Sequence, residues 1–226
     1  MNYTYDELSR IVCYPRYDHQ IFQERMSYLQ NKRIKLLKYG KSIVNNCNVL
    51  GKGHAGIVIK GMIDDKEVAV KIRRMDSKRS SFRKEEQMLE LANNVGVGPK
   101  LYYANDDIII MEYIDGVSIK EFLERGNNAY IIKQVLDQCF RLDCINLDHG
   151  ELSNMDKHVI ISDKATIIDF DSASINRKVS NVTSATQYLL NYLQSNKDDI
   201  FYELRRYKHC ICKDCFDNIL TALKVK

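Results

Sequence analysis

The chain has 226 residues, of which 45% are hydrophobic and 28% are charged. This apolar content is typical of a packed globule and excludes a mainly disordered chain, while ten glycines and two prolines exclude collagen-like and proline-rich proteins. With 34 basic against 30 acidic residues, the formal net charge of +4 is too small to indicate a nucleic-acid partner by itself.

The N-terminal region shows no targeting signal and is predicted to be helical. Met1–Glu7 has neither a basic start nor an apolar core, and no apolar run approaches the roughly 20 residues that span a bilayer. We therefore expect a cytoplasmic protein with no membrane contact and with its seven cysteines reduced. Gln20–Lys38 lacks proline and glycine and predicts a helix that ends before Gly40, so residues 1–40 are expected to form an N-terminal helical extension.

Residues 41–114 are predicted to form a β-rich lobe with one helix. The helix is expected from Ser80 or Ser81, either of which could cap it, through Asn94. The strands share alternating or continuous apolar patterns that contain many β-branched residues. They are predicted at Ser42–Leu50, Ile57–Met62, Glu67–Ile72, Leu101–Ala104 and Ile108–Tyr113.

Residues 115–226 are predicted to form a mainly helical lobe. Helices are expected at Ile119–Arg125, at Asn128–Leu142 and again beyond Thr183. Two short strands, Val159–Ile161 and Ala165–Ile168, lie between them. The expected fold class is therefore α+β, with a β-rich half followed by a mainly helical half.

A cysteine motif lies close to the C-terminal end of the sequence. Cys210, Cys212 and Cys215 form a C-x-C-x-x-C pattern beside His209. This pattern fits a zinc or cluster site, but the second C-x-x-C pair of the usual zinc sites is missing. Three reduced cysteines on a terminal helix are the alternative, which the residues alone favour.

A glycine-rich segment, Gly51-Lys52-Gly53-His54-Ala55-Gly56, is the first pattern that carries chemistry. Glycines allow backbone N–H groups to approach phosphate oxygens where a Cβ would collide. A dinucleotide fold needs a strand, a glycine turn and then a helix. The residues that follow here, Ile57-Val58-Ile59-Lys60, are strand-like, so the segment predicts a hairpin that covers phosphates.

A lysine inside an apolar strand is the second pattern. Lys71 ends Val68-Ala69-Val70-Lys71, and Glu85 follows fourteen residues later in the predicted helix. An ammonium in such a strand needs anions, and a nucleotide phosphate together with a carboxylate would serve. An edge-strand lysine and a surface glutamate are the alternative, but the preceding glycine hairpin makes that alternative the weaker one.

Two acidic clusters occur in the second half of the chain, and the second of them follows the expected strand Ala165–Ile168. They are Asp148-His149-Gly150-Glu151 and Asp169-Phe170-Asp171. Carboxylates placed in this way suit hard cations such as Mg²⁺, which prefer oxygen ligands, and also suit a base beside a transferred phosphoryl group.

Between the two halves, Ile110–Gly116 runs from an apolar strand into Glu-Tyr and then glycine, and the backbone of such a connector could pair with an adenine edge.

Taken in this order, the segments resemble the atypical protein-kinase-like superfamily over about Val49–Asp171, more than half of the chain. No Ala-Pro-Glu motif follows Asp169, and only about 55 residues remain after Asp171. In this respect the chain is similar to the RIO and KEOPS-associated kinases, whose reduced lobes lack the segment that docks peptides. The resemblance implies a bilobal protein-kinase-like fold, with residues 41–114 as the N-lobe and residues 115–226 as a reduced C-lobe.

The resemblance also implies that ATP and Mg²⁺ are the cofactors. Lys71 would bind the α- and β-phosphates and pair with Glu85, and Asp169 would hold Mg²⁺. The residues implied to contact ATP are Gly51, Lys52, Gly53, His54, Ala55, Gly56, Val58, Ala69, Lys71, Met111, Glu112 and Ile114.

Three positions depart from the family pattern. Glu151 stands in place of the catalytic aspartate, and a displacement of about 1 Å from its extra methylene can cost roughly 10²-fold in rate. Asp156 is the favoured counterpart of the metal-binding asparagine, with His158 and Asn154 as alternatives. Asp171 replaces the glycine of Asp-Phe-Gly.

The resemblance implies a minimal microbial serine/threonine protein kinase that transfers the γ-phosphate of ATP to a hydroxyl group, its own included, with a protein as the expected substrate. One alternative is a small-molecule kinase of the aminoglycoside or choline kinase type, which His149-Gly150 and Asp169-Phe170-Asp171 support. Another is a nucleotide-binding pseudokinase scaffold, which Glu151 and Asp156 support. The basic segment Lys32–Lys41 permits an RNA partner, but nothing further in the sequence supports one.

Overall fold

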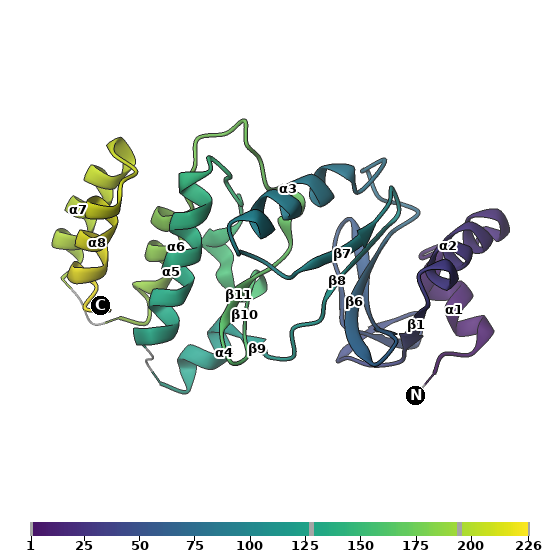
Figure 1. Ribbon diagram of the computed structural model, residues 1–226. Helices are drawn as coiled ribbons and strands as arrows, with labels where there is room; N and C mark the ends of the chain where they lie inside the picture. Colours follow the sequence, from purple (N-terminus) through teal and green to yellow (C-terminus); the bar gives the residue numbers. More distant parts are fainter. Residues whose placement is uncertain (1, 127–128, 194–195, 226) are drawn as a thin grey trace. The chain divides into compact units, whose positions relative to one another are not determined.

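The structure is a computed structural model that describes residues 2–126, 129–193 and 196–225. The chain forms two compact units (Figure 1). The first unit comprises Met1–Gln87 and Lys100–Tyr113, and the second comprises Met88–Pro99 and Ile114–Lys226. Among the described residues, no helix has both the length and the apolar character that a membrane span requires.

The first unit is built on a six-stranded antiparallel sheet. Its strands run in the order β1-β5-β6-β8-β7, and β4 pairs with β5. The strands are β1 (Ile34–Leu37), β4 (Gly51–Lys52), β5 (Gly56–Ile63), β6 (Lys66–Arg73), β7 (Leu101–Ala104) and β8 (Ile108–Glu112). The long central strands β5 and β6 are joined by a tight turn, and they pair over their whole length, from Gly56 opposite Arg73 to Ile63 opposite Lys66.

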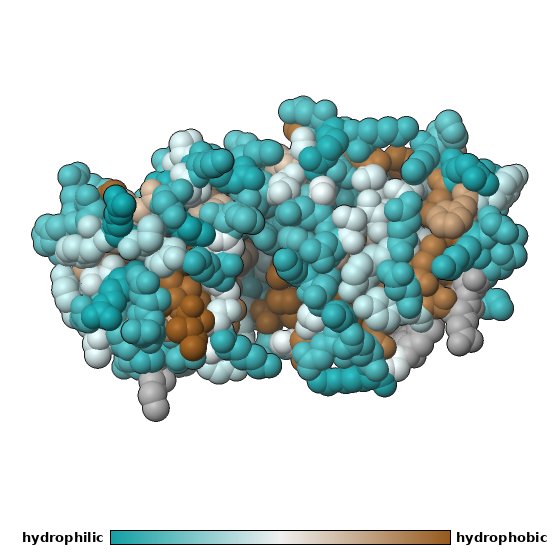
Figure 2. Space-filling model, turned by 180° about the vertical axis from the view of Figure 1, so that it is seen from behind, coloured by the Kyte–Doolittle hydropathy of each residue, from teal (hydrophilic) through white to brown (hydrophobic). Residues whose placement is uncertain are grey.

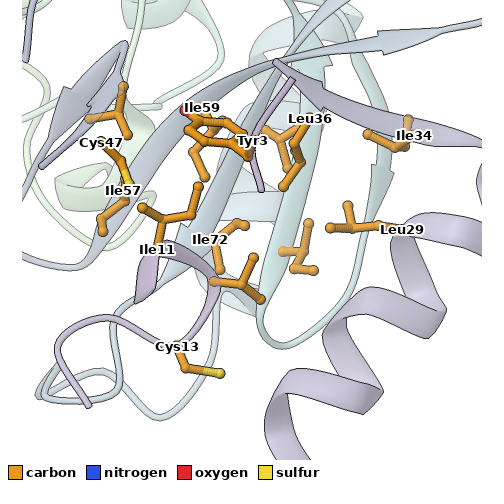
Figure 3. Packing of buried hydrophobic residues seen from close by; sticks show 14 of the residues in the cluster. Tyr3, Ile11, Cys13, Leu29, Ile34, Leu36, Cys47, Ile57, Ile59 and Ile72 are labelled. Carbon is orange, nitrogen blue, oxygen red and sulfur yellow. The ribbon is translucent and has the colours of Figure 1, made fainter. Parts of the chain in front are cut away.

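The N-terminal residues are built into the core of this unit. Helices α1 (Tyr5–Val12) and α2 (His19–Asn31) contribute apolar side chains that pack with one face of the sheet (Figure 3). We call this cluster the N-terminal core. Its buried members are Tyr3, Ile11, Val12, Cys13, Phe22, Leu29, Ile34, Leu36, Val44, Cys47, Val49, Ile57, Ile59, Val68, Val70, Ile72, Ile108 and Ile110.

The helix predicted at Gln20–Lys38 is shorter than expected. It ends at Asn31, Arg33 adopts a left-handed conformation with φ of 56°, and Ile34–Leu37 forms strand β1. Along β1 the residues alternate between buried and less buried positions, which is the period of a strand, and the strand pairs with β5. Sheet pairing and core burial therefore override helix propensity in this segment.

The strand predicted at Ser42–Leu50 is a hairpin. Strands β2 (Ser42–Val44) and β3 (Cys47–Val49) are joined by Asn45 and Asn46, which both have positive φ. Asparagine tolerates this conformation better than most residues, and two successive positive φ values suit a tight hairpin turn. The strands predicted at Leu101–Ala104 and Ile108–Tyr113 are β7 and β8, which pair with each other as an antiparallel hairpin.

The second unit is mainly helical and carries one small sheet. Strands β9 (Val117–Ser118), β10 (Val159–Ile161) and β11 (Ala165–Ile167) form this sheet in the order β11-β10-β9. The helices are α4 (Ile119–Glu124), α5 (Ala129–Cys144), α6 (Asn181–Leu189), α7 (Lys197–His209) and α8 (Lys213–Ala222). Helix α3 (Arg83–Asn94) begins in the first unit and ends in the second. The start predicted for α5 at Asn128 lies outside the described residues.

The predicted α+β class is confirmed, since a β-rich unit is followed by a mainly helical one. The face of the protein that Figure 2 shows is largely hydrophilic, with separate hydrophobic patches. Most large apolar side chains are therefore used in the cores of the two units.

A buried carboxylate joins three helices of the second unit. Asp143, near the end of α5, accepts hydrogen bonds from the backbone N–H groups of Asn181 and Val182 at 3.1 and 3.2 Å and from the Tyr207 hydroxyl at 2.9 Å. Burial raises the pKa of Asp143 above its usual value, although these donors act in the opposite direction. A carboxylate at the first turn of α6 also interacts favourably with the helix dipole.

Tyr207→Phe is expected to lower the unfolding free energy by about 1.5–3 kcal/mol, because it removes a buried hydrogen bond to a carboxylate. The measurement is urea denaturation followed by circular dichroism. Tyr202→Phe is the matched control, since Tyr202 lies on the same helix with its side chain 56% exposed and should be neutral. Equal stability of the two variants would contradict a structural role for the Asp143–Tyr207 bond.

Candidate functional site

The glycine-rich segment forms the predicted hairpin. Gly51 and Lys52 of β4 pair with Val58 and Ile57 of β5, and the Gly53 N–H donates to the Gly56 carbonyl at 2.8 Å. The arrangement is strand, turn and strand, which differs from the strand, turn and helix of a dinucleotide-binding fold.

The three glycines have different surroundings. A Cβ at Gly56 would lie 2.9 Å from the Ile72 carbonyl oxygen and 3.2 Å from Cγ of Lys71, so close packing of the hairpin on β6 requires glycine there. At Gly53 the nearest atom would be 3.7 Å away, and at Gly51 no described atom would lie within 4 Å. Packing within the protein therefore does not require glycine at Gly53 or Gly51. A bound group that approaches the backbone closely would require glycine there, because a Cβ would be in its way.

Contacts from elsewhere in the first unit hold this hairpin. Arg74 donates from its backbone N–H to the Ala55 carbonyl at 2.9 Å and from its guanidinium to the Gly53 carbonyl at 3.0 Å. The Lys52 ammonium donates to the Tyr14 hydroxyl at 2.6 Å, so the segment that joins α1 and α2 reaches the hairpin. His54, at the tip, is exposed.

The sheet register places the residues implied to contact the nucleotide on one face. Val58 lies opposite Lys71, Lys71 lies opposite Ile109, and Ala69 lies opposite Met111. Residues directly opposite each other on paired strands share a face. The intervening residues of β5 and β6 point to the other face and belong to the N-terminal core. One face of the sheet is thus used for the core and the other carries Val58, Ala69, Lys71 and Met111.

A buried ion pair lies on that second face. The Lys71 ammonium is 2.6 Å from Oε1 of Glu85 on α3, and the two side chains are only 8% and 4% exposed. Strand β6 lies between β5 and β8, so Lys71 is not an edge-strand lysine, and Glu85 is not a surface residue. Two charges buried away from water carry a desolvation cost that geometry and further partners must offset.

The end of β8 supplies the connector residues. The Glu112 N–H donates to the Lys100 carbonyl at 2.8 Å, and the Glu112 carboxylate accepts from the Lys100 N–H at 3.1 Å. Any backbone contact of Glu112 with adenine would therefore have to use its carbonyl oxygen. Ile114, where the second unit begins, is half-buried.

In the second unit, Asp169 follows β11 in a left-handed conformation with φ of 67° and ψ of 76°. Aspartate and asparagine are among the few residues that tolerate this region. A short 3-10 helix, Phe170–Ser172 (η2), follows, and the Phe170 ring is buried edge-on against His149 with centroids 5.0 Å apart. The backbone turn that carries Asp169 is therefore anchored by the aromatic side chain next to it.

His149 links the two acidic clusters. Its ring nitrogen Nε2 lies 3.0 Å from the Ile168 carbonyl, and because a carbonyl can only accept, Nε2 carries the hydrogen. Burial lowers the pKa of His149 to about 4, so the ring is neutral at pH 7. The backbone N–H of His149 donates a hydrogen bond to Oδ1 of the Asn181 side chain at 2.8 Å. His149 thereby holds the residue before Asp169 beside the segment that contains Glu151.

Asp148 fixes the same segment from the other side. Its carboxylate accepts from the Ser180 N–H at 2.9 Å and from Nε of Arg177 at 2.5 Å, and the Arg177 guanidinium also donates to the Ser172 carbonyl at 3.0 Å. Gly150 has φ of 89°, and a Cβ there would collide with the Arg177 guanidinium. The sequence pattern groups Asp148 with acidic residues suited to a cation and does not predict its bond to Arg177, which is 29 residues away in the chain.

Glu151 is partly exposed and stands before a 3-10 segment, Leu152–Lys157 (η1). Its carboxylate lies 3.9 Å from Nε2 of His158, whose buried ring contacts His149 edge-on with centroids 5.4 Å apart. The side chain of Glu151 is 41% exposed. A carboxylate in this position is accessible from solvent and has a histidine beside it.

Asp156, Asn154 and His158 are the candidates for a second metal ligand. Asp156 is half-buried in η1, Asn154 is exposed, and the ring of His158 is packed on His149. Within the described part of the chain, Asp169 and Asp156 belong to no group of three or more close metal-binding side chains. Such a group is not required for Mg²⁺, which is usually held by one or two carboxylates, substrate phosphates and water. The donor set is thus compatible with Mg²⁺ bound together with a nucleotide.

Comparison with known proteins identifies a family and a relative that resemble this chain. A family model described as the RIO domain matches residues 58–185, which include Lys71, Glu85, Glu151 and Asp169. An uncharacterized protein of the archaeon Methanocaldococcus jannaschii is 31% identical over 83 residues, which cover 35% of this chain and 71% of that protein. The family match begins after the glycine turn and ends within α6.

Proposed function

The chain belongs to the RIO domain family, which is part of the atypical protein-kinase-like superfamily, and on this premise we propose that it is a serine/threonine protein kinase. It would transfer the γ-phosphate of ATP to a hydroxyl group of a protein substrate, its own chain included. The observation that carries the proposal is the buried Lys71–Glu85 pair beside a glycine hairpin. Residues 41–114 would be the N-lobe, residues 115–226 the reduced C-lobe, and residues 1–40 an extension.

The first unit would supply the nucleotide contacts. Lys71, held by Glu85, would contact the α- and β-phosphates, and the hairpin from Gly51 to Gly56 would cover them. Val58, Ala69 and Met111 share the face of the sheet that carries Lys71, which supports a role for their apolar side chains beside the base. Backbone atoms of Glu112 and Ile114 would contact the adenine edge.

The second unit would supply the acidic groups. Asp169 and Asp156 would hold Mg²⁺, which when bound neutralises phosphate charge. Glu151 would accept or orient the proton of the acceptor hydroxyl, and its partial exposure suits contact with a substrate. Asp148 and His149 would act as positioning residues, because they hold the backbone on either side of Glu151 and Asp169.

Incubation with labelled ATP and Mg²⁺, followed by mass spectrometry of the labelled molecule, tests this proposal. Glu151→Gln is expected to lower kcat about 10²-fold, since the amide cannot accept the proton. Asp163→Asn is the matched control, because Asp163 is an exposed turn residue of the same unit, and its activity should equal that of the unmodified protein.

The outcome that would contradict kinase activity is also specific. If ATP raises the melting temperature but no label reaches any acceptor, the pseudokinase scaffold is the better function. If the label appears on a small molecule while proteins stay unlabelled, the substrate class proposed here is wrong.

A further inference from the structure

The two C-terminal helices lie beyond the family match and carry a cluster of thiols. Helix α7 ends at His209 and α8 begins at Lys213, so the C-x-C-x-x-C motif occupies the turn between them and the first turn of α8. The Sγ atoms of Cys210, Cys212 and Cys215 all lie within 4.8 Å of one another. We propose that these three cysteines bind one Zn²⁺ ion as thiolates, independently of the kinase site.

The distances fit a metal better than a disulfide. With Zn–S bonds of about 2.3 Å, tetrahedral geometry places sulfur atoms about 3.8 Å apart, so a small inward movement of the thiols suffices. A disulfide requires sulfur atoms about 2.05 Å apart and joins only two of the three. All three cysteines are free thiols in the structure.

The backbone of the turn holds the three side chains together. The Cys210 N–H donates to the Arg206 and Tyr207 carbonyls at the end of α7, and the Cys212 N–H donates to the Cys210 carbonyl at 2.9 Å. Cys212 then occupies the N-cap position of α8, with Cys215 in the first turn. These hydrogen bonds fix the backbone that carries the three cysteines.

Charge and protons balance in the binding step. Three neutral thiols each transfer their sulfur lone pair to Zn²⁺ and release one proton to solvent, so the site changes from neutral to a net charge of −1. Lys208 precedes the motif and Lys213 lies inside it, and the Lys213 ammonium pairs with Asp217 at 2.7 Å. Cys215 is buried, Cys212 is half-buried and Cys210 is exposed, so one side of the site is open. Water would fill the fourth position there, since the His209 ring is not part of the cluster.

Metal content of the full chain, purified under reducing conditions, tests the proposal. We expect one zinc per chain by mass spectrometry of the elements, and loss of most of it in Cys212→Ser and Cys215→Ser. Cys144→Ser is the matched control, because Cys144 is an exposed cysteine in the same unit outside the cluster, and its zinc content should be unchanged.

A second measurement removes the dependence on variants that fold poorly. Zinc is removed from the unmodified protein with a chelator, and Co²⁺ is added. Binding should give thiolate-to-cobalt charge-transfer bands and the visible bands of tetrahedral Co²⁺, both reversed by Zn²⁺. The proposal fails if no zinc is present and no cobalt spectrum develops, if iron is found in place of zinc, or if two of the cysteines are joined in a disulfide that excludes metal.

Discussion

Asp169→Asn should reduce kcat for phosphoryl transfer on the order of 10³-fold while leaving the unfolding free energy almost unchanged. The carboxylate at this position is the group proposed to hold Mg²⁺, and a neutral amide is a much weaker ligand for a hard cation. Asparagine is chosen because the backbone there has φ of 67°, a conformation that asparagine tolerates and alanine does not. The measurement is the initial rate of label transfer from ATP at saturating Mg²⁺.

Asp171→Asn is the control that separates a specific role from a general loss of negative charge. Asp171 lies two residues further along, in η2, where the kinase pattern has glycine. We expect Asp171→Asn to reduce kcat by less than about 10-fold, because the Asp171 carboxylate would add negative charge near the metal without binding it. Equal losses in the two variants would mean that Asp169 has no special role, and an active Asp169→Asn protein would rule out the proposed metal site.

Lys71→Met is expected to lower the unfolding free energy by about 3–5 kcal/mol, because it leaves the Glu85 carboxylate buried without its ammonium partner. Phosphoryl transfer should also be lost, since the contact to the α- and β-phosphates disappears. The double variant Lys71→Met, Glu85→Leu should recover most of the stability, because apolar residues of similar size often replace a buried ion pair at little cost. It should recover none of the activity. Urea denaturation and label transfer together measure both effects.

Lys60→Met provides a matched comparison for stability. Lys60 is also a buried lysine of the same sheet, and its ammonium lies 2.6 Å from Glu67. Glu67 is 48% exposed, so water can solvate it once the lysine is removed, and we expect a loss of only about 1 kcal/mol. If Lys60→Met and Lys71→Met are equally destabilising, burial of the partner carboxylate is not what makes the Lys71–Glu85 pair costly to break.

The second acidic cluster shows how far local sequence can indicate a site. Asp169-Phe170-Asp171 is recognisable because the residues are contiguous and follow a short apolar strand. The conformation of Asp169 depends on His149, about 20 residues earlier, which bonds the Ile168 carbonyl and packs on Phe170. No spacing or periodicity in the sequence indicates these contacts, since they arise only when η2 folds back on the earlier segment.

The N-terminal region shows the opposite case, in which local propensity misleads. Residues 32–38 continue a helix-like composition, yet Ile34 and Leu36 are placed in a strand because β5 offers hydrogen bonds and the N-terminal core offers burial. The apolar pattern of Ser42–Leu50 likewise predicts one strand, where the structure has a hairpin that turns at Asn45 and Asn46. Both errors concern segments whose structure depends on a partner strand elsewhere in the chain.

The α+β order of the two halves, the glycine hairpin, the strand that carries Lys71 and the place of Asp169 after a short strand could all be predicted from the amino-acid sequence, because they follow from glycine placement and from the period of apolar residues over short windows. The packing of separate elements was needed to show that the Lys71–Glu85 pair is buried, that residues 1–40 complete the core of the first unit, and that the three thiols lie within 4.8 Å of one another. These features depend on packing and on hydrogen bonds between separate elements, whose free energy exceeds the small local preferences that a sequence displays.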